Sequence, residues 1–183
     1  MDPQERPTLV WVDLELTGLD HHKDQIIEIA VALSDLHCHD VVLGPDLVLN
    51  TSDHLLAEMT PYVQEMHRKS GLTDLVRASQ VTLTQAEAII AQFLTINHVQ
   101  SGVIAGSSVH FDRKFLKIGM PGLFQGLIDP LAIFNVSSIK EVSAAWYKHY
   151  SAPAKRLQHR SRDDILESIE EFRYYQRTIL RLR

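Results

Sequence analysis

The sequence predicts a single α/β domain in which a mixed five-stranded sheet carries helices on both faces. Three short runs rich in β-branched and aliphatic residues open the chain, and beyond residue 50 the apolar spacing becomes that of amphipathic helices, interrupted by two further strand-like runs. With 183 residues, 45% of them hydrophobic, the chain has an ordinary size for one compact domain. We therefore expect one domain over residues 1–183.

The expected strands are short apolar runs bounded by turn-forming residues. The first three form a meander, and the other two alternate with helices. Their ranges are 8–16, 25–34, 41–50, 103–106 and 132–136.

The expected helices follow residues that can cap a helix N-terminus. A capping box at residues 84–87 should begin one long amphipathic helix, and a second box at residues 138–141 should begin a later one. A helix is also expected over residues 111–118, residues 150–158 read as a loop, and a final helix runs from Ser161 to the C-terminus. The other candidate start and stop residues are Ser52, Thr60, Pro61, Gly71 and Thr73.

Composition limits the partners. The formal net charge of −5, from 18 basic and 23 acidic residues, gives no broad cationic field for long duplex nucleic acid, so a nucleic-acid partner should be short or locally bound. The single cysteine, Cys38, rules out an internal disulfide and suits a reducing compartment. The sequence contains no secretory signal pattern and no apolar run of about 18 residues, which predicts a soluble protein without a membrane partner.

Two carboxylates stand in the first apolar strand, "VWVDLELTGL". Side chains two residues apart lie on the same face of a strand, so Asp13 and Glu15 should lie side by side. Two partly desolvated like charges are costly unless a positive charge lies between them. Either the strand is at an edge with its polar face in water, or the pair belongs to a site for a hard divalent cation such as Mg²⁺ or Mn²⁺.

Further candidate ligands lie far along the chain. Asp112 stands at the start of a helix after the fourth strand, and His159 precedes the final helix, whose first turn holds Asp163 and Asp164. Taken singly, each aspartate could simply favour the positive end of a helix, and the histidine could be a solvated loop residue. The metal-site interpretation therefore depends on the whole set.

Together these residues carry a resemblance to a known family. The stretches "WVDLELTGLD", "DQIIEIA", "HRKSGLT", "GSSVHFDRKFL", "MP", "VSSIKEV" and "DDILESIEEFRYYQR", with a histidine and an aspartate five residues apart, occur in order from about residue 10 to residue 177. In this respect the chain resembles the oligoribonuclease family of DEDDh 3′-to-5′ exonucleases, which have a ribonuclease-H-like fold.

The resemblance implies a hydrolase that cuts short single-stranded RNA, with short DNA as an alternative, into nucleoside 5′-monophosphates. It implies that Asp13, Glu15, Asp112 and Asp164 hold two divalent ions, Mg²⁺ or Mn²⁺, and that His159 is the general base. Two ions can activate the attacking water and stabilise the leaving 3′ oxygen, and their charge offsets that of four carboxylates. A histidine with a near-neutral pKa suits the transfer of a proton at physiological pH.

The resemblance also implies substrate contacts, a homodimer and a cytoplasmic location, with mitochondria as the alternative. Leu19 would wedge against one base and Tyr62, where tryptophan is usual, would contact the other; ordinary packing is the alternative for both. Base stacking tolerates any sequence, so little sequence preference is expected. The residues implied in a cap over the 5′ phosphate are His67, Ser108, Ser137 and Ser138.

The chain departs from the family pattern at this cap. Leu131 and Ala132 replace a tyrosine and an arginine, and Asn135 replaces an aspartate. Alanine cannot grip phosphate as arginine does, so the cap should be weaker or rebuilt with Arg113 or Lys114. Two alternatives stay open: an exonuclease that trims longer RNA or DNA 3′ ends, and a catalytically silent RNA-binding module. Two smaller departures are Ser107 for asparagine and Phe111 for glutamate or glutamine.

Overall fold

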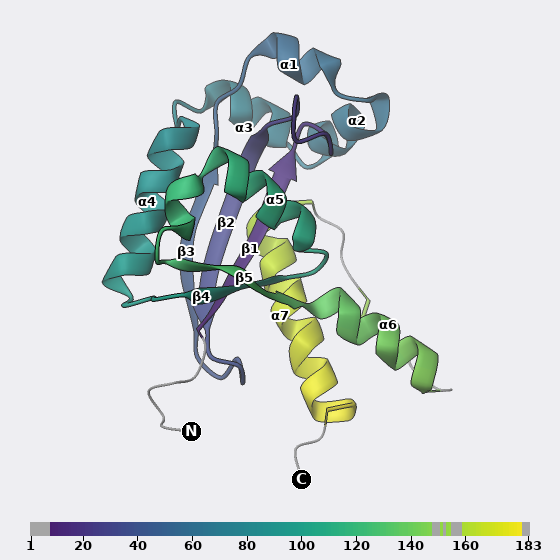
Figure 1. The fold of residues 1–183 in the computed structure, drawn as a ribbon. Helices are drawn as coiled ribbons and strands as arrows, with labels where there is room; N and C mark the ends of the chain where they lie inside the picture. The colour runs from purple at the N-terminus through teal and green to yellow at the C-terminus, as the bar shows by residue number, and fades with distance from the viewer. Residues whose placement is uncertain (1–7, 148–150, 152, 155–158, 181–183) are drawn as a thin grey trace.

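The computed structural model describes residues 8–147, 151, 153–154 and 159–180. Five strands form one sheet in the order β3-β2-β1-β4-β5, which confirms the expected mixed α/β fold (Figure 1). The elements in chain order are β1 (Leu9–Leu16), β2 (Ile26–Ser34), β3 (Val41–Val48), α1 (Asp53–Glu58), α2 (Pro61–Lys69), α3 (Leu72–Ala78), α4 (Leu83–Ile96), β4 (Gly102–Gly106), α5 (His110–Gly119), the 3₁₀ helix η2 (Pro121–Phe124), β5 (Ile128–Asn135), α6 (Val136–Trp146) and α7 (Ser161–Thr178).

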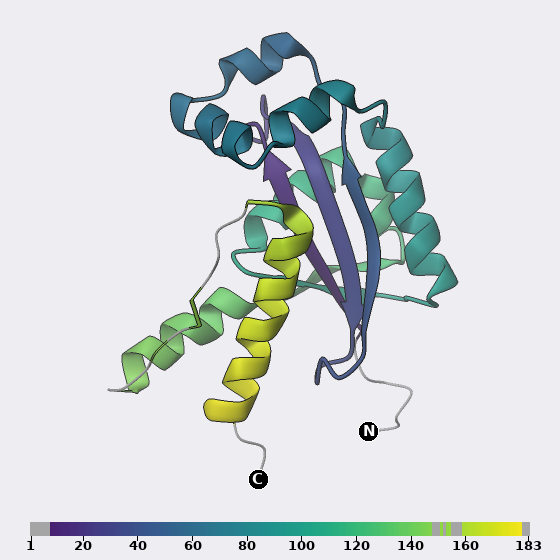
Figure 2. The ribbon, with the colours of Figure 1, turned by 180° about the vertical axis from the view of Figure 1, so that it is seen from behind.

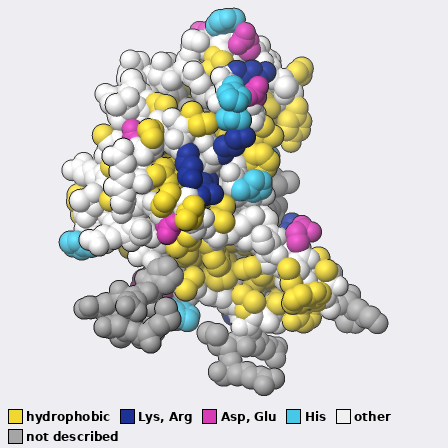
Figure 3. Space-filling model, in the orientation of Figure 1, with side chains coloured by type: hydrophobic (Ala, Val, Ile, Leu, Met, Phe, Trp, Pro, Cys, Tyr) yellow, Lys and Arg dark blue, Asp and Glu magenta, His cyan; other side chains and the backbone are white. Residues whose placement is uncertain are grey.

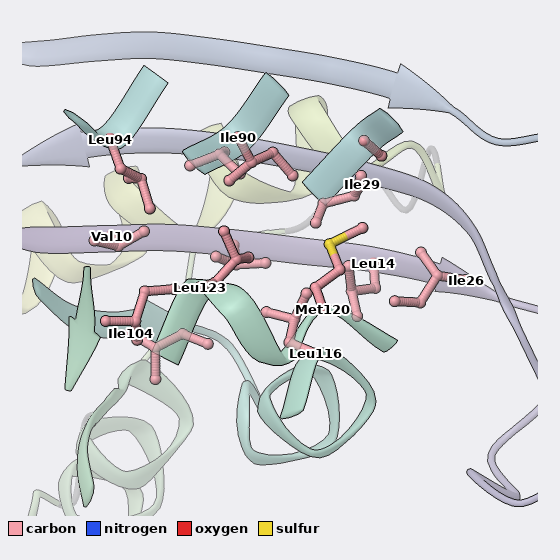
Figure 4. Close-up of a cluster of buried hydrophobic side chains, with 14 of the residues drawn as sticks. Val10, Leu14, Ile26, Ile29, Ile90, Leu94, Ile104, Leu116, Met120 and Leu123 are labelled. Carbon is pink, nitrogen blue, oxygen red and sulfur yellow. The ribbon is translucent and has the colours of Figure 1, made fainter. Parts of the chain in front are cut away.

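The strands β1, β2 and β3 form the expected antiparallel meander, whereas β4 and β5 run parallel to β1. Because side chains alternate along a strand, β1 sends neighbouring residues to opposite faces of the sheet. On one face Val10, Val12 and Leu14 are packed in a core with α4, α5 and η2 (Figure 4).

Helix α7 covers the opposite face, as the view from behind shows (Figure 2). Trp11 of β1 is fully buried there, with Ile165, Ile169 and Phe172 of α7 in the same cluster. The Trp11 indole donates a hydrogen bond of 2.8 Å to the Ser34 hydroxyl, so the polar group of this large side chain is satisfied.

Both expected capping boxes were misplaced. Helix α4 begins two residues earlier than expected, because the Thr82 hydroxyl accepts from the Gln85 amide while the Gln85 side chain accepts from the Thr82 amide. Glu87 instead accepts from the Gly122 amide at 2.6 Å.

The second box, the bounds of β5, the start of α3 and the end of α7 also differ from the expectations. The second box lies inside α6, which begins at Val136 after the cap Asn135. The strand β5 spans Ile128–Asn135, so it begins four residues and ends one residue earlier than the expected range 132–136. Gly71, not Thr73, precedes α3. Most of the expected loop over residues 150–158 lies outside the described residues, and α7 ends at Thr178, short of the expected end at the C-terminus. Among the helices that the structure describes, none has the length and apolarity to cross a membrane.

Candidate active site

The candidate site begins where β1 passes beyond the hydrophobic core. Leu9 and Trp11 face α7, and the alternation continues this row with Asp13 and Glu15. Leu14, between them, packs into the core on the other face. The metal-site interpretation therefore had the correct face relationship, and Glu15 is nearly inaccessible, with 6% of its surface exposed.

Helix α5 brings Asp112 to the same strand. The pairing of β1 with β4 covers only Leu9 to Trp11, so the later backbone of β1 is not bonded to β4. The Leu14 amide donates a hydrogen bond of 3.0 Å to Asp112 Oδ1. This bond ties the first turn of α5 to the strand segment between Asp13 and Glu15.

The start of α7 supplies the remaining two groups. Ligand atoms of Glu15, His159 and Asp164 all lie within 4.8 Å of one another. His159 has a φ of 52°, a left-handed conformation that a non-glycine residue adopts at some cost, and it stands two residues before the helix begins. The five residues predicted from the sequence thus converge, although their roles stay predictions.

Burial and mutual repulsion make the acidic cluster difficult to ionise. Burial, followed by the charges of Asp164, Glu28 and Asp112, raises the pKa of Glu15 to about 8. Burial likewise raises the pKa of Asp112 to about 7. The pKa of Asp13 is also raised well above its usual value, by burial first and then by the neighbouring carboxylates. A bound cation would favour the ionised forms of all of these groups.

The donor set fits a hard divalent cation. Carboxylate oxygens and one imidazole converge at a distance that a single ion can span, and the pKa values of Asp13 and Glu15 are raised by burial first and then by the neighbouring carboxylates. The residues that could hold such ions are Asp13, Glu15, Asp112 and Asp164, with His159 beside them.

The predicted substrate residues occupy different environments. Leu19 is 68% exposed and Tyr62 is 74% exposed, so both side chains are open to solvent. His67 is fully buried, and its Nε2 lies 2.9 Å from the Leu16 carbonyl, so this ring is not available at the surface. Its role in the phosphate cap therefore gains no support from its position.

Two of the predicted cap serines meet. The Ser108 amide donates to Asn135 Oδ1 and to Ser137 Oγ, both at 3.0 Å, and the two serine hydroxyls are 3.3 Å apart. Ser138 lies in the first turn of α6 and is exposed. Ser108, Ser137 and Asn135 thus form one hydrogen-bonded cluster.

Sequence reasoning missed two residues beside the acidic cluster, Glu28 and Arg160. Glu28 lies opposite Glu15 in the pairing of β1 with β2 and is 1% exposed. The Arg160 guanidinium donates to its carboxylate at 2.6 and 2.9 Å. The available signal was a glutamate in the otherwise apolar stretch "IIEIA", but nothing local in the sequence identified its partner 132 residues away.

Comparisons with known proteins show the family of the chain. A family model described as Exonuclease matches residues 10–172. A "Probable oligoribonuclease" of Dictyostelium discoideum is 42% identical over 175 residues, which cover 94% of this chain and 90% of that protein. An "Oligoribonuclease" of Arabidopsis thaliana is 40% identical over 186 residues, covering 100% and 82%. An "Oligoribonuclease, mitochondrial" of Homo sapiens is 42% identical over 177 residues, covering 94% and 73%.

Solved structures support the ribonuclease-H-like fold. The zinc-bound complex of E. coli exonuclease I with single-stranded DNA matches with a TM-score of 0.72 at 15% identity, over 97% of this chain and 42% of the other. The complex of the same enzyme with a dA16 oligonucleotide also gives 0.72, at 16% identity, over 96% and 42%. The chain thus spans less than half the length of these solved exonucleases, and the likeness shows the fold alone. From the family model and the relatives at about 40% identity, the chain belongs to the oligoribonuclease family of exonucleases.

Proposed function

We propose that this chain is a single-domain, metal-dependent 3′-to-5′ exoribonuclease that hydrolyses short oligoribonucleotides to nucleoside 5′-monophosphates. The observation that carries the proposal is the convergence of Glu15, His159 and Asp164, with Asp13 and Asp112 beside them, in a member of the oligoribonuclease family. A domain used only to bind RNA has no physical need for clustered acids, which repel phosphate.

In this proposal Asp13, Glu15, Asp112 and Asp164 hold two divalent ions, Mg²⁺ or Mn²⁺. When bound, such a pair supplies activation of the attacking water and neutralisation of charge on the phosphodiester. The Leu14 amide fixes the Asp112 carboxylate, and the sheet fixes Asp13 and Glu15, so these ligands are held before substrate arrives. His159, at the end of a loop, accepts the proton of the attacking water at its imidazole ring.

Turnover with and without metal tests this function directly. A five-nucleotide RNA incubated with Mn²⁺ should yield nucleoside 5′-monophosphates from its 3′ end, and excess EDTA should abolish the products. Asp13→Asn should behave like the EDTA sample, because it removes the charge of one proposed ligand without changing its shape. RNA binding without hydrolysis at saturating Mn²⁺ would favour the catalytically silent RNA-binding module instead.

Leu19 and Tyr62 are proposed to contact the bases of the substrate. Both side chains are exposed, and an apolar or aromatic surface suits any base because stacking uses the face of the ring and not its edge. The proposal implies similar rates on RNAs of equal length and different sequence. The cap over the 5′ phosphate would use Ser108 and Ser137, which already lie within 3.3 Å of each other.

A second candidate, the trimming of longer RNA or DNA ends, is favoured by the altered cap. Leu131 is 83% exposed at the position where the family has tyrosine, and Ala132 follows it. Arg113 and Lys117 of α5 both donate to the carbonyl of Pro130, directly before this segment. Positive charge therefore lies near the substituted cap, and basic side chains are visible over α5 (Figure 3).

Substrate length separates the two candidates. An arginine contact with phosphate is worth roughly 1.5–3 kcal/mol, so its loss removes about 10- to 100-fold of any preference for dinucleotides. We expect kcat/KM for two-, five- and ten-nucleotide RNAs to agree within about tenfold at saturating Mn²⁺. A strict dinucleotide preference would contradict the weakened cap, and equal rates on matched DNA would extend the substrate to short DNA.

We also propose a homodimer and a cytoplasmic location, with mitochondria as the alternative. Hydrophobic side chains gather over α6 (Figure 3), and Leu131 and Trp146 are exposed by 83% and 76%. Light scattering should give a dimer for the parent and a monomer for Leu131→Asp. Ile96→Asp is the matched control, since Ile96 is 65% exposed on α4. A monomeric parent would refute the dimer, and cell fractionation decides the compartment.

A further inference from the structure

Glu28 is a buried acid with every oxygen engaged. Its Oε1 accepts from Arg160 Nη2 at 2.6 Å and from Nε at 2.9 Å, and its Oε2 accepts from Nε at 3.2 Å and from the Ser161 amide at 3.1 Å. Removing an ionised carboxylate from water costs several kcal/mol unless a partner compensates it, and here a bidentate guanidinium does so. Because both oxygens are occupied, Glu28 is not a further metal ligand.

The partners of Glu28 are Arg160 and Ser161, which lie in the sequence between His159 and Asp164 of the candidate site. Arg160 directly follows His159 and precedes α7, whose first turn carries Asp164. The side chain of Arg160 makes no cap for the helix, so the Glu28 carboxylate takes that place by accepting from the Ser161 amide. A negative charge at a helix N-terminus is favourable, and the helix begins with the bond from the Asp164 amide to the Arg160 carbonyl at 3.0 Å.

The strand that carries Glu28 also fixes its relation to the acidic cluster. Glu28 is the cross-strand partner of Glu15, so one end of the link is set by the sheet itself. The other end sets where the chain turns at His159, whose φ of 52° needs support from its surroundings. The distance between the imidazole and the Glu15 carboxylate therefore depends on the contact between Glu28 and Arg160.

We infer that Glu28 and Arg160 are positioning residues that hold His159 and the first turn of α7 against Asp13 and Glu15. The inference rests on the proposed function, because the base and the ligands that the pair positions are those of the proposed hydrolysis. In this inference the pair acts through His159 and α7, because the contacts of Arg160 are with the Glu28 carboxylate. Loss of the pair would lower turnover by displacing His159 and the first turn of α7. A displacement of about 1 Å in such a site can lower a rate about 100-fold.

Two substitutions test the pair against a matched control. Glu28→Gln keeps the shape and an acceptor for the Ser161 amide but removes the charge, and Arg160→Met keeps the length of the stem without the donors. Arg173→Met is the control: the Arg173 side chain has the same exposure as that of Arg160, 29%, and it also ties α7 to the sheet side of the protein through the Cys38 carbonyl, remote from His159.

With a five-nucleotide RNA and Mn²⁺, we expect Glu28→Gln and Arg160→Met each to lower kcat about 10- to 100-fold while KM changes less than about threefold. The double variant should lose no more than the worse single variant, because both remove one interaction. Arg173→Met should lower the thermal midpoint without this loss of kcat. Equal kcat losses in Arg160→Met and Arg173→Met, or fully additive losses in the double variant, would overturn the inference.

A measurement on the metal-free protein keeps this test separate from the proposed function. The ring resonances of His159, assigned by their absence in His159→Gln, should shift in Arg160→Met at constant pH and stay in place in Arg173→Met. Unchanged His159 resonances in Arg160→Met would overturn the positioning role even if the parent hydrolyses RNA. If Arg160→Met does not fold, Arg160→Lys takes its place and should give a smaller shift in the same direction, since lysine cannot bind in a bidentate way.

Discussion

Removing metal and raising the pH should destabilise this protein through its acidic cluster. The pKa of Glu15 is raised from 4.5 to about 8 and that of Asp112 from 3.8 to about 7, burial being the main cause in both. Between the unfolded and folded pKa values the folded state binds more protons than the unfolded state. Stability is therefore present at low pH and is lost as the pH rises through the folded values.

The size of this effect follows from the two shifts. Each group contributes about 1.4 kcal/mol per pH unit inside its window, so two groups lose about 3 kcal/mol of unfolding free energy between about pH 5.5 and 6.5. For a domain of this size that corresponds to a fall of about 6–12 °C in the thermal midpoint. Because metal ligands must be deprotonated, added Mn²⁺ should raise the midpoint more at pH 7 than at pH 5.5.

Thermal melts in EDTA, followed by circular dichroism, measure the effect. The double variant Glu15→Gln/Asp112→Asn is the necessary control, since it retains all ten histidines, which titrate in the same range. His67 works in the opposite direction, because burial lowers the pKa of its imidazole and so favours the folded state at higher pH. Parallel pH trends for the parent and the double variant would refute the reasoning.

Three other predictions concern single side chains. His159→Ala should keep calorimetric Mn²⁺ uptake and lose about 100-fold or more of kcat, as expected for a general base; near-normal turnover would remove His159 from that role. Tyr62→Ala should raise KM on five-nucleotide RNA about tenfold with little change in folding, since stacking on an exposed ring is worth roughly 1–3 kcal/mol, and an unchanged KM would leave Tyr62 without a substrate contact. Leu94→Ala, in the fully buried core under α4, should lower the unfolding free energy in urea by about 2–5 kcal/mol, whereas Ile96→Ala on the exposed side of that helix should change it by less than about 1 kcal/mol.

The sequence predicted those parts of the molecule that depend on local period and spacing. The alternation in "VWVDLEL" placed Asp13 and Glu15 on one face because the side-chain period of a strand is fixed at two residues. Asp112, His159 and Asp164 were further candidates in the sequence, but only the resemblance joined them to one site, because no local pattern could predict their convergence. Their pairing depends on how α5 and α7 cross the two faces of the sheet.

The errors arose where several residues compete for one local role. Thr82 and Thr84 both suit the start of α4, and only the reciprocal bonds with Gln85 select the first. Residues 138–141 match a capping box, but the Asn135 side chain accepts from the Ser137 amide and begins the helix earlier. The contact between Glu28 and Arg160 could not be predicted, because it joins a strand and a helix across most of the sequence.

The position of α7 has a consequence for translation. This helix lies late in the chain, yet it packs against β1 near the beginning and supplies Asp164 to the same cluster as Asp13. A nascent chain that has emerged only as far as β5 would lack both His159, the proposed base, and Asp164. Ribosome-bound intermediates of this protein would therefore be unable to degrade RNA. The ability to hydrolyse RNA would appear only when α7 packs against β1.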